Sequence, residues 1–243
     1  MSVLFVTGTG TEIGKTVTTA AVAAAALAAG RSVAVLKPAQ TGVGPLEPGD
    51  AAEVARLAGD VTTAELGRYP EPLAPATAAR RAGRTPVSPE QVADAARKLA
   101  PDHDLVLVEG AGGLLVRFDD TGSTLADAAQ LLGAPVLVVA PAGLGTLNSA
   151  ALTGEALRSR GLECRGVVIG SWPDKPGLAS RCNVGDLPGC AGAPLLGAVP
   201  QGAGAMAPTV FRTAAASWLA PALGGTWDAD DFTARVQELP EPA

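Results

Sequence analysis

The feature that most limits the possible folds of this chain is a glycine-rich segment, residues 7–16 (TGTGTEIGKT), directly behind the apolar run 3–6. A buried strand that breaks into a Gly-rich turn and then into Gly-Lys-Thr is typical of a phosphate-binding loop. Glycines let backbone N–H groups surround an anion, the start of the next helix adds its positive end, and Lys15 adds a full charge. Thr16 offers a hydroxyl to Mg²⁺. The alternative is a strand–helix turn with an exposed lysine. The strand before and the helix-forming run after favour a nucleoside triphosphate site.

Short apolar runs alternate with longer helical segments along the rest of the chain. We expect strands at residues 3–6, 33–36, 105–108, 135–139, 167–169 and 195–199, and helices at residues 16–29, 50–57, 88–99, 124–132 and 146–160. This alternation predicts an α/β fold, a doubly wound, mostly parallel sheet with helices on both faces, of the P-loop NTPase type. We expect residues 1–243 to form a single domain, with a loop-rich insertion at about 173–193 and a helical C-terminal tail at about 206–238. Residues 60–88 are expected to be irregular apart from one short helix.

Composition excludes several classes of function. The net charge of −6 argues against a broad contact with a nucleic-acid backbone. The longest apolar run, residues 20–29, is too short to span a membrane, and the N-terminus lacks the pattern of a signal peptide, so we expect a cytoplasmic protein. The three cysteines have no metal-type spacing and are expected to be reduced thiols. His103, the only histidine, lies in a turn that we expect to be solvated, which disfavours a Ser–His or Cys–His nucleophile.

Two further turns that follow predicted strands carry charged residues. Ligands of a doubly wound sheet bind at the carboxyl ends of its strands. Lys37 opens the turn 37–42 (KPAQTG), where it would face the same crevice as Lys15. Two ammonium groups that converge on one triphosphate suit phosphoryl transfer. The alternative for Lys37 is a surface lysine before a rigid turn.

The third predicted strand ends in a carboxylate, Glu109, followed by a glycine-rich turn, residues 110–113. Four apolar residues and then a carboxylate have the form of a Walker B strand, with Glu in place of the usual Asp. The glycines would let a ligand approach the backbone closely. An exposed glutamate in a plain turn is the alternative, which the glycine content disfavours. For Asp50 the simple interpretation is a cap of the helix 50–57.

The three motifs together, residues 8–16, 37–42 and 108–113, resemble those of the dethiobiotin synthetases of the biotin pathway. They occur in the same order, and the long loop, with five residues between Gly8 and Gly14, is the form of this family. The resemblance implies a ligase that takes 7,8-diaminopelargonic acid, CO₂ and ATP. A carbamate forms on one amine, ATP phosphorylates it, and the second amine closes the ureido ring of dethiobiotin.

The resemblance also implies roles for individual residues. Lys37 would be catalytic together with Lys15 and Thr11, and Thr41 would touch the substrate. Mg²⁺ would be held by Thr16, Asp50 and Glu109. The nucleotide would be bound by Glu12, Ile13, Gly14, Lys15, Thr16, Val17, Asp50, Glu109, Gly110, Ala111 and Gly112.

Family members are homodimers, and in them the partner subunit meets the substrate carboxylate. The matching segment here is Gly145, Thr146, Leu147 and Asn148, where a helix is predicted to begin. The chain departs from the family at the base-binding end. Many relatives have an Asn there, whereas this sequence has Gly170 and Ser171, followed later by Pro200, Gln201 and Gly202. This departure predicts weak discrimination between bases, so that ATP or another triphosphate such as CTP would serve.

Three other functions fit the sequence less well. A partition or septum-placing ATPase of the same fold would carry an extra lysine early in the loop, where this chain has Gly8, Thr9 and Gly10. Such proteins also use a DNA- or membrane-binding surface, which the net charge does not support. A regulatory domain without catalysis would have no need of the charged turns. A cobyrinic-type amide synthase would need a glutaminase domain, for which the chain is too short.

Overall fold

The computed structural model describes residues 2–239 and contains one seven-stranded sheet of parallel strands in the order β3-β2-β4-β1-β5-β6-β7. The strands are β1 (Ser2–Gly8), β2 (Val33–Thr41), β3 (Thr62–Tyr69), β4 (Leu105–Gly113), β5 (Val136–Ala140), β6 (Cys164–Trp172) and β7 (Leu195–Pro200). Strand β1 lies at the centre, with Phe5 opposite Val108 on β4 and Val136 on β5. The predicted doubly wound, parallel α/β fold is confirmed.

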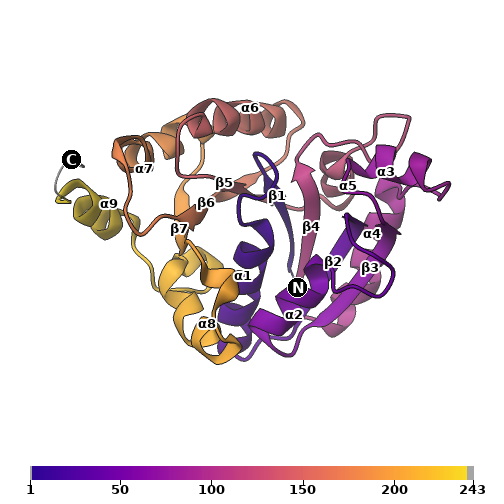
Figure 1. Cartoon of the computed structure of the whole chain (residues 1–243), viewed down its shortest axis with the longest axis horizontal. Coiled ribbons are helices and arrows are strands. Elements are labelled where there is room, and N and C mark those ends of the chain that lie inside the picture. The colour runs from indigo at the N-terminus through magenta and orange to yellow at the C-terminus, as the bar shows by residue number, and fades with distance from the viewer. Residues whose placement is uncertain (1, 240–243) are drawn as a thin grey trace.

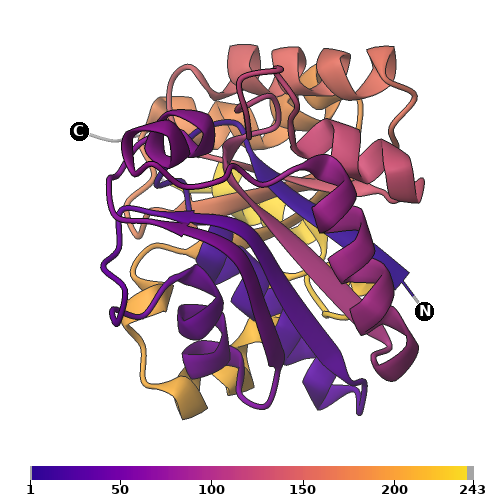
Figure 2. The ribbon, with the colours of Figure 1, turned by 90° about the vertical axis from the view of Figure 1, so that its right-hand side faces the viewer.

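Helices cover both faces of the sheet (Figures 1 and 2). They are α1 (Lys15–Ala28), α2 (Asp50–Ala58), α3 (Pro75–Arg81), α4 (Pro89–Leu99), α5 (Leu125–Leu132), α6 (Thr146–Ser159), α7 (Leu178–Ala191), α8 (Pro208–Ala215) and α9 (Ala229–Gln237). Single 3₁₀ turns are η1 (Ala100–Asp102), η2 (Ala203–Ala205), η3 (Ala216–Trp218) and η4 (Pro221–Leu223). In Figure 1, α6 and α7 lie above the sheet, while α1, α2 and α8 pack against one another below it.

The core follows from the covering of both faces. Strand β1 is apolar along its length, and Leu4, Phe5 and Val6 are all buried. Parallel strands need such continuous apolar runs because neither face meets water. Helix α1 fills the space below with a row of buried alanines, whose small side chains let the helix lie close to the sheet. Figure 2 looks onto the edge strand β3, where burial is much weaker.

The prediction that residues 60–88 are irregular is wrong for β3. This strand pairs in parallel with β2 along its length, and Tyr69 at its end is buried with its hydroxyl donating to the carbonyl of Thr85 (3.0 Å). Its sequence, TTAELGRY, is polar because it lies at the edge of the sheet and faces water on one side. No apolar run marks a strand of this kind.

The prediction of a loop-rich insertion at 173–193 is also wrong, because residues 178–191 form helix α7. Gly185, Pro188 and Gly189 disfavour a helix when judged locally. Packing overrides this preference, since Val184 and Leu187 are buried and α7 lies along α6. The helical segment expected at 206–238 contains α8 and α9.

His103 is half-buried, not solvated as expected. Its Nδ1 lies 2.7 Å from the carbonyl oxygen of Leu99 and its Nε2 2.7 Å from Thr62 Oγ1, so the ring ties the start of β3 to the end of α4. The three cysteines are free thiols. Among the helices of residues 2–239, none has the length and apolar character needed to cross a membrane.

Candidate functional site

The loop between β1 and α1 has the shape of a phosphate cradle. Gly14, in the left-handed region (φ 91°), forms the N-cap of α1, so the N–H groups of the first helical turn have no side-chain cap. The buried Lys15 folds back over the loop, and its Nζ donates to the carbonyl of Gly10 (2.8 Å). Burial, followed by the charge of Lys37, lowers the pKa of Lys15. Glu12 is the only non-glycine residue with positive φ (58°) in the described chain. Such conformations cluster at ligand-binding sites.

Gly170 supports this loop from behind. A Cβ on Gly170 would lie 2.1 Å from the carbonyl oxygen of Ile13, and a Cβ on Gly14 would lie 2.0 Å from the carbonyl oxygen of Gly170. Only two glycines can bring the backbones so close. The end of β6 is therefore packed directly against the loop. Gly170, expected from the sequence to face the base, has its backbone against the phosphate loop.

Four polar side chains converge beside the loop. Contrary to the expectation, Lys37 does not open a turn but lies at the middle of β2, which continues to Thr41. It is 2% exposed and directs its Nζ to Glu109 Oε1 (3.0 Å) and to the carbonyl of Gly110 (3.1 Å). It also pairs with the carboxylate of Asp50. Thr16 Oγ1 donates to the same Glu109 oxygen (2.9 Å). The cluster joins segments that are distant in the sequence, because β2 and β4 are neighbours in the sheet and the first turns of α1 and α2 lie beside them.

The electrostatics of Lys37 are set by its two carboxylate partners. Burial alone would lower its pKa, but the charges of Glu109 and Asp50 and the hydrogen bonds that Lys37 donates to them outweigh burial and raise it. Lys37 therefore keeps its proton in a place from which water is excluded. The pKa of Lys37 is raised and that of Lys15 is lowered, because only Lys37 pairs directly with carboxylates.

The simple interpretation of Asp50 as the cap of its helix is wrong. The N-cap of α2 is Gly49, and Asp50 is the first helical residue. Its backbone N–H donates to Gln40 Oε1 (2.7 Å), and its side chain turns toward Lys37. Gln40, whose role was not foreseen, thus fixes the start of α2 beside the cluster.

The oxygens of this cluster suit Mg²⁺. Glu109 is 1% exposed, and its Oε2 has no hydrogen-bond partner in the part of the chain that the structure describes. A buried carboxylate oxygen without a partner is costly unless a ligand satisfies it. Hydroxyl and carboxylate oxygens are the donors that Mg²⁺ prefers. No group of three or more His, Cys, Asp or Glu side chains within residues 2–239 could hold a metal by itself. Thr16 and the phosphates of a nucleotide would have to complete the coordination.

A cavity of about 720 Å³ opens over the cluster. Eleven of the residues predicted for the site line this cavity: Thr11, Glu12, Gly14, Lys15, Thr16, Val17, Lys37, Thr41, Asp50, Ala111 and Gly112. Its other wall, which the sequence did not indicate, is apolar and consists of residues 72–75 and Val116. The two prolines of this wall, Pro72 and Pro75, flank the start of α3 in the segment expected to be irregular.

The remaining predicted residues lie outside this lining. Glu109, Gly110 and Ile13 lie directly behind it, in contact with Lys37 or Gly170. The base-side turns meet each other, since Gln201 N–H donates to the carbonyl of Trp172 (2.7 Å), next to Ser171. Pro200 and Gly202 flank Gln201 there. Residues 145–148 form the start of α6, away from the cavity lining of this chain.

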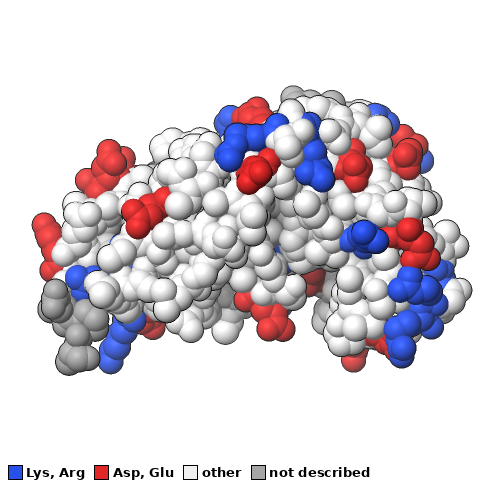
Figure 3. Space-filling model, turned by 90° about the horizontal axis from the view of Figure 1, so that it is seen from above, with Lys and Arg blue, Asp and Glu red and all other residues white. Residues whose placement is uncertain are grey.

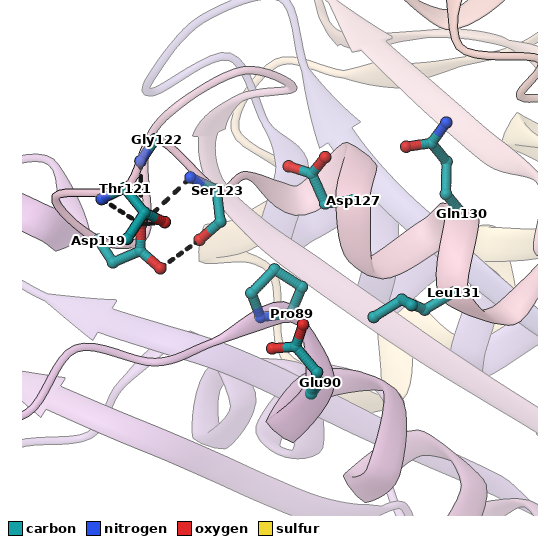
Figure 4. Close-up of a pocket in the computed structure, with 9 residues that line it drawn as sticks. All are labelled: Pro89, Glu90, Asp119, Thr121, Gly122, Ser123, Asp127, Gln130 and Leu131. Atoms are coloured by element: carbon teal, nitrogen blue, oxygen red, sulfur yellow. Dashed lines mark hydrogen bonds between the residues drawn. The ribbon is translucent and has the colours of Figure 1, made fainter.

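A second cavity, of about 590 Å³, lies between the starts of α4 and α5 (Figure 4). Two of its acidic groups, Asp119 and Asp127, are already engaged. The carboxylate of Asp119 accepts hydrogen bonds from Thr121, Gly122 and Ser123, as the dashed lines show. Asp127 caps α5 by accepting from Thr124. These hydrogen bonds stabilise the turn 119–123 and the start of α5, so the residues that make them have a structural role.

Comparisons with known proteins agree with this geometry. A family model described as an AAA domain matches residues 2–209. The chain is 75% identical over 232 residues (96% of this chain, 98% of the other) to a protein of Streptomyces avermitilis named ATP-dependent dethiobiotin synthetase BioD. It is 72% identical over 232 residues, with the same coverage, to the protein of that name from Streptomyces coelicolor. Among solved structures, a ParA family ATPase from Chlorobium tepidum TLS has a TM-score of 0.55 at 15% identity, with 98% of this chain and 99% of that chain covered. That likeness shows the fold alone.

Proposed function

Because the chain belongs to the family of ATP-dependent dethiobiotin synthetases, we propose that it closes the ureido ring of dethiobiotin. The substrates are 7,8-diaminopelargonic acid, CO₂ as dissolved bicarbonate, and a nucleoside triphosphate. The observation that supports this best is the buried, doubly paired ammonium of Lys37 beside the phosphate loop. A fixed positive charge in a dry site stabilises the charge that develops on transferring phosphoryl oxygens.

The reaction proceeds in three bond changes. One amine of the substrate adds to CO₂ and loses a proton, which forms a carbamate. A carbamate oxygen then attacks the γ-phosphorus, and the bond to the bridging oxygen breaks and leaves a nucleoside diphosphate. Finally the second amine attacks the carbamate carbon, the carbon–nitrogen bond forms, and the carbon–oxygen bond breaks to release phosphate. No side chain needs to form a covalent bond, so this cyclo-ligase needs no nucleophile–base pair.

The chain's own residues supply charge and orientation. Lys15 and Lys37 would neutralise the phosphates and the carbamate from two sides, since they flank one cavity. Lys37 keeps its proton because its pKa is raised by Glu109 and Asp50. Thr11 and Thr41 offer hydroxyls on the cavity wall, and the apolar residues 72–75 suit the alkyl chain of the substrate. Thr16, Asp50 and Glu109 would hold Mg²⁺, which supplies further positive charge to the phosphates when bound.

Base discrimination is expected to be weak. The turns after β6 and β7 present mostly backbone groups, and Gly170 is used to support the phosphate loop. Ser171 and Gln201 remain as side chains that could reach a base. Gln201 is the one amide among these groups, and the Asn that many relatives have at the position of Gly170 and Ser171 is missing, so CTP would serve at least as well as ATP.

We also propose a homodimer. The face over α6 and α7 has a broad area without charged side chains (Figure 3). Leu144, 91% exposed, and the exposed Leu152 and Leu178 belong to these elements or to the loop before α6. Exposed large apolar side chains on a face with few charges are typical of protein interfaces. A partner subunit there could present its residues 145–148 to the cavity of the first.

Product analysis tests the proposal. The protein is incubated with diaminopelargonic acid, bicarbonate, Mg²⁺ and one triphosphate at a time, and the product is identified by mass spectrometry. We expect dethiobiotin, with phosphate released in equal amount. The contrary result is that no ring product forms and that the triphosphate is hydrolysed equally fast with and without the diamine. That result would indicate a switch ATPase of the same fold instead.

A further inference from the structure

A buried amide on α7 holds the loop that leads from β5 into α6. Asn183 is 6% exposed, and its Nδ2 donates to the carbonyl of Ala142 (2.8 Å) and to the carbonyl of Gly143 (3.0 Å). Both acceptors lie in the short loop 141–145, far from Asn183 in sequence. An amide is well suited here, because it offers two donors and carries no charge into the interior.

The loop has little else to fix its shape. The N-cap of α6 is Gly145 in the left-handed region (φ 88°), and it gives no side-chain cap to the helix. The carbonyl of Gly143, which Asn183 holds, also accepts from the N–H of Thr146 (3.3 Å). Asn183 thus sets the carbonyl on which the first helical residue closes. At the other end of the turn, the N–H and the hydroxyl of Ser149 hold the carbonyl of Gly145, so Asn183 is the contact from outside this segment that fixes the direction of the first N–H groups of α6.

The start of α6 has the character of an anion site. Its first N–H groups lack a side-chain cap, and the positive end of the helix dipole lies there. The hydroxyl oxygen of Thr146, buried at this end, has no hydrogen-bond partner within residues 2–239. Gly145 next to it is exposed. The N–H groups that follow Thr146 in the first turn of α6, next to the exposed Gly145, are suited to an acceptor such as a carboxylate.

We propose that Asn183 is a positioning residue that shapes the turn 143–148 to receive the carboxylate of the diamine substrate. This inference rests on the proposed function and the proposed homodimer, in which residues 145–148 of one subunit meet the carboxylate of the substrate bound to the other. The role differs from plain support of α7. Support of the helix would change stability alone, whereas positioning of the turn changes the binding of one chemical group on one substrate.

The test compares Asn183→Asp with Val184→Ala in the full chain. Asp keeps the shape but sets a carboxylate against two carbonyl oxygens, so the turn can no longer close on Gly143. We expect the KM for diaminopelargonic acid to rise about tenfold, since two buried hydrogen bonds are lost. The KM for the triphosphate and kcat should change less than about twofold by the same reasoning. Val184 is buried on the same helix and does not bond the loop, so Val184→Ala should lower stability and leave both KM values unchanged.

A second substrate separates positioning from general damage. 2,3-Diaminooctane has the same vicinal amines and alkyl chain but no carboxylate. For this diamine, kcat/KM should be equal in Asn183→Asp and the parent protein. An equal loss on both diamines, or an unchanged KM for diaminopelargonic acid, overturns the inference. If Asn183→Asp does not fold, Asn183→Ala removes the same donors without adding a charge and carries the same expectations.

Amide hydrogen exchange keeps this inference distinct from the proposed function. If the parent protein makes no dethiobiotin, the proposed function fails, and with it the assignment of the carboxylate. The effect of Asn183 on the turn can still be measured. We then expect the backbone amides of residues 143–148 to exchange faster in Asn183→Asp than in Val184→Ala. Equal exchange in the two variants overturns the positioning role itself.

Discussion

Lys37 and Glu109 show how single residues acquire their chemistry from the fold. Each is nearly fully buried, and each would be costly there without its partner. Their neighbours decide the outcome: two carboxylates keep Lys37 charged, whereas Lys15, with burial and a nearby ammonium against it, has a lowered pKa. At this scale the sequence indicated which residues matter, since each ends an apolar run. The pairing of Lys37 with Asp50 needed the three-dimensional structure.

Replacement of Lys37 by Ala should lower kcat at least about a hundredfold, the usual loss when one preorganised electrostatic group is removed. Glu109 would also lose its buried partner, so the free energy of unfolding should fall, and kcat must be measured well below the midpoint of thermal unfolding. Lys98→Ala, at an exposed lysine on α4, is the matched control and should be without effect. A folded Lys37→Ala protein with near-normal kcat would remove Lys37 from the mechanism.

Replacement of Glu109 by Gln should raise the Mg²⁺ concentration for half-maximal turnover about tenfold or more, because a charged oxygen ligand is lost. Binding of the nucleotide to the phosphate loop should persist, since Gln can still accept from Thr16. A titration of kcat with Mg²⁺ and a separate calorimetric titration with nucleotide distinguish the two effects. Asp50→Asn is the companion variant. An unchanged Mg²⁺ dependence there would leave Asp50 with the role of pairing Lys37 only.

At the scale of elements, the sequence predicted those whose pattern is local. The start of helix α4 was predictable from Ser88 and Gln91, which form a capping box in the structure. Strand β3 and helix α7 were missed because neighbours decide them: β3 is polar at an edge, and α7 keeps Pro188 within a helix packed on α6. The apolar wall at 72–75 was missed with β3, since both lie in the segment without a clear pattern.

Two glycines in the α6–α7 pair should respond in opposite ways to Ala. A Cβ on Gly154 of α6 would lie 2.3 Å from the carbonyl oxygen of Ala191, so Gly154→Ala should destabilise the protein by about 1–3 kcal/mol. A Cβ on Gly189 of α7 meets nothing within 4 Å, so Gly189→Ala should stabilise it by about 0.4–1 kcal/mol. Urea unfolding of both variants measures this. Equal signs would mean that the packing of these helices differs from the one described.

The turns after β6 and β7 should give little preference for adenine. A bidentate amide that reads a base is worth about 1–3 kcal/mol, and these turns offer mostly backbone. CTP should therefore bind, or support turnover, at least as well as ATP. Calorimetric titrations with ATP, GTP, CTP and UTP decide the matter. If ATP binds about tenfold or more tightly than each of the others, an adenine-reading group exists that the structure did not reveal.

At the scale of the whole molecule, the sheet places the phosphate loop beside Lys37 of β2 and Glu109 of β4 and thereby creates a site that no segment could form alone. The fold was predictable because parallel strands buried on both faces require apolar runs, and these are visible in the sequence. The single domain proposed for residues 1–243 and the homodimer depend on contacts that no local pattern records. The central claim concerns the site at this edge: it drives ring closure by phosphorylating a carbamate.

Oxygen transfer tests that claim most directly. The protein is mixed with diaminopelargonic acid, a triphosphate, Mg²⁺ and bicarbonate freshly labelled with oxygen-18, and the released phosphate is analysed by mass spectrometry before the label exchanges with water. Because a carbamate oxygen attacks the γ-phosphorus and leaves with it, the account predicts one labelled oxygen in the phosphate for each ring formed. Ring formation with unlabelled phosphate would contradict it, since the triphosphate would then be cleaved by water.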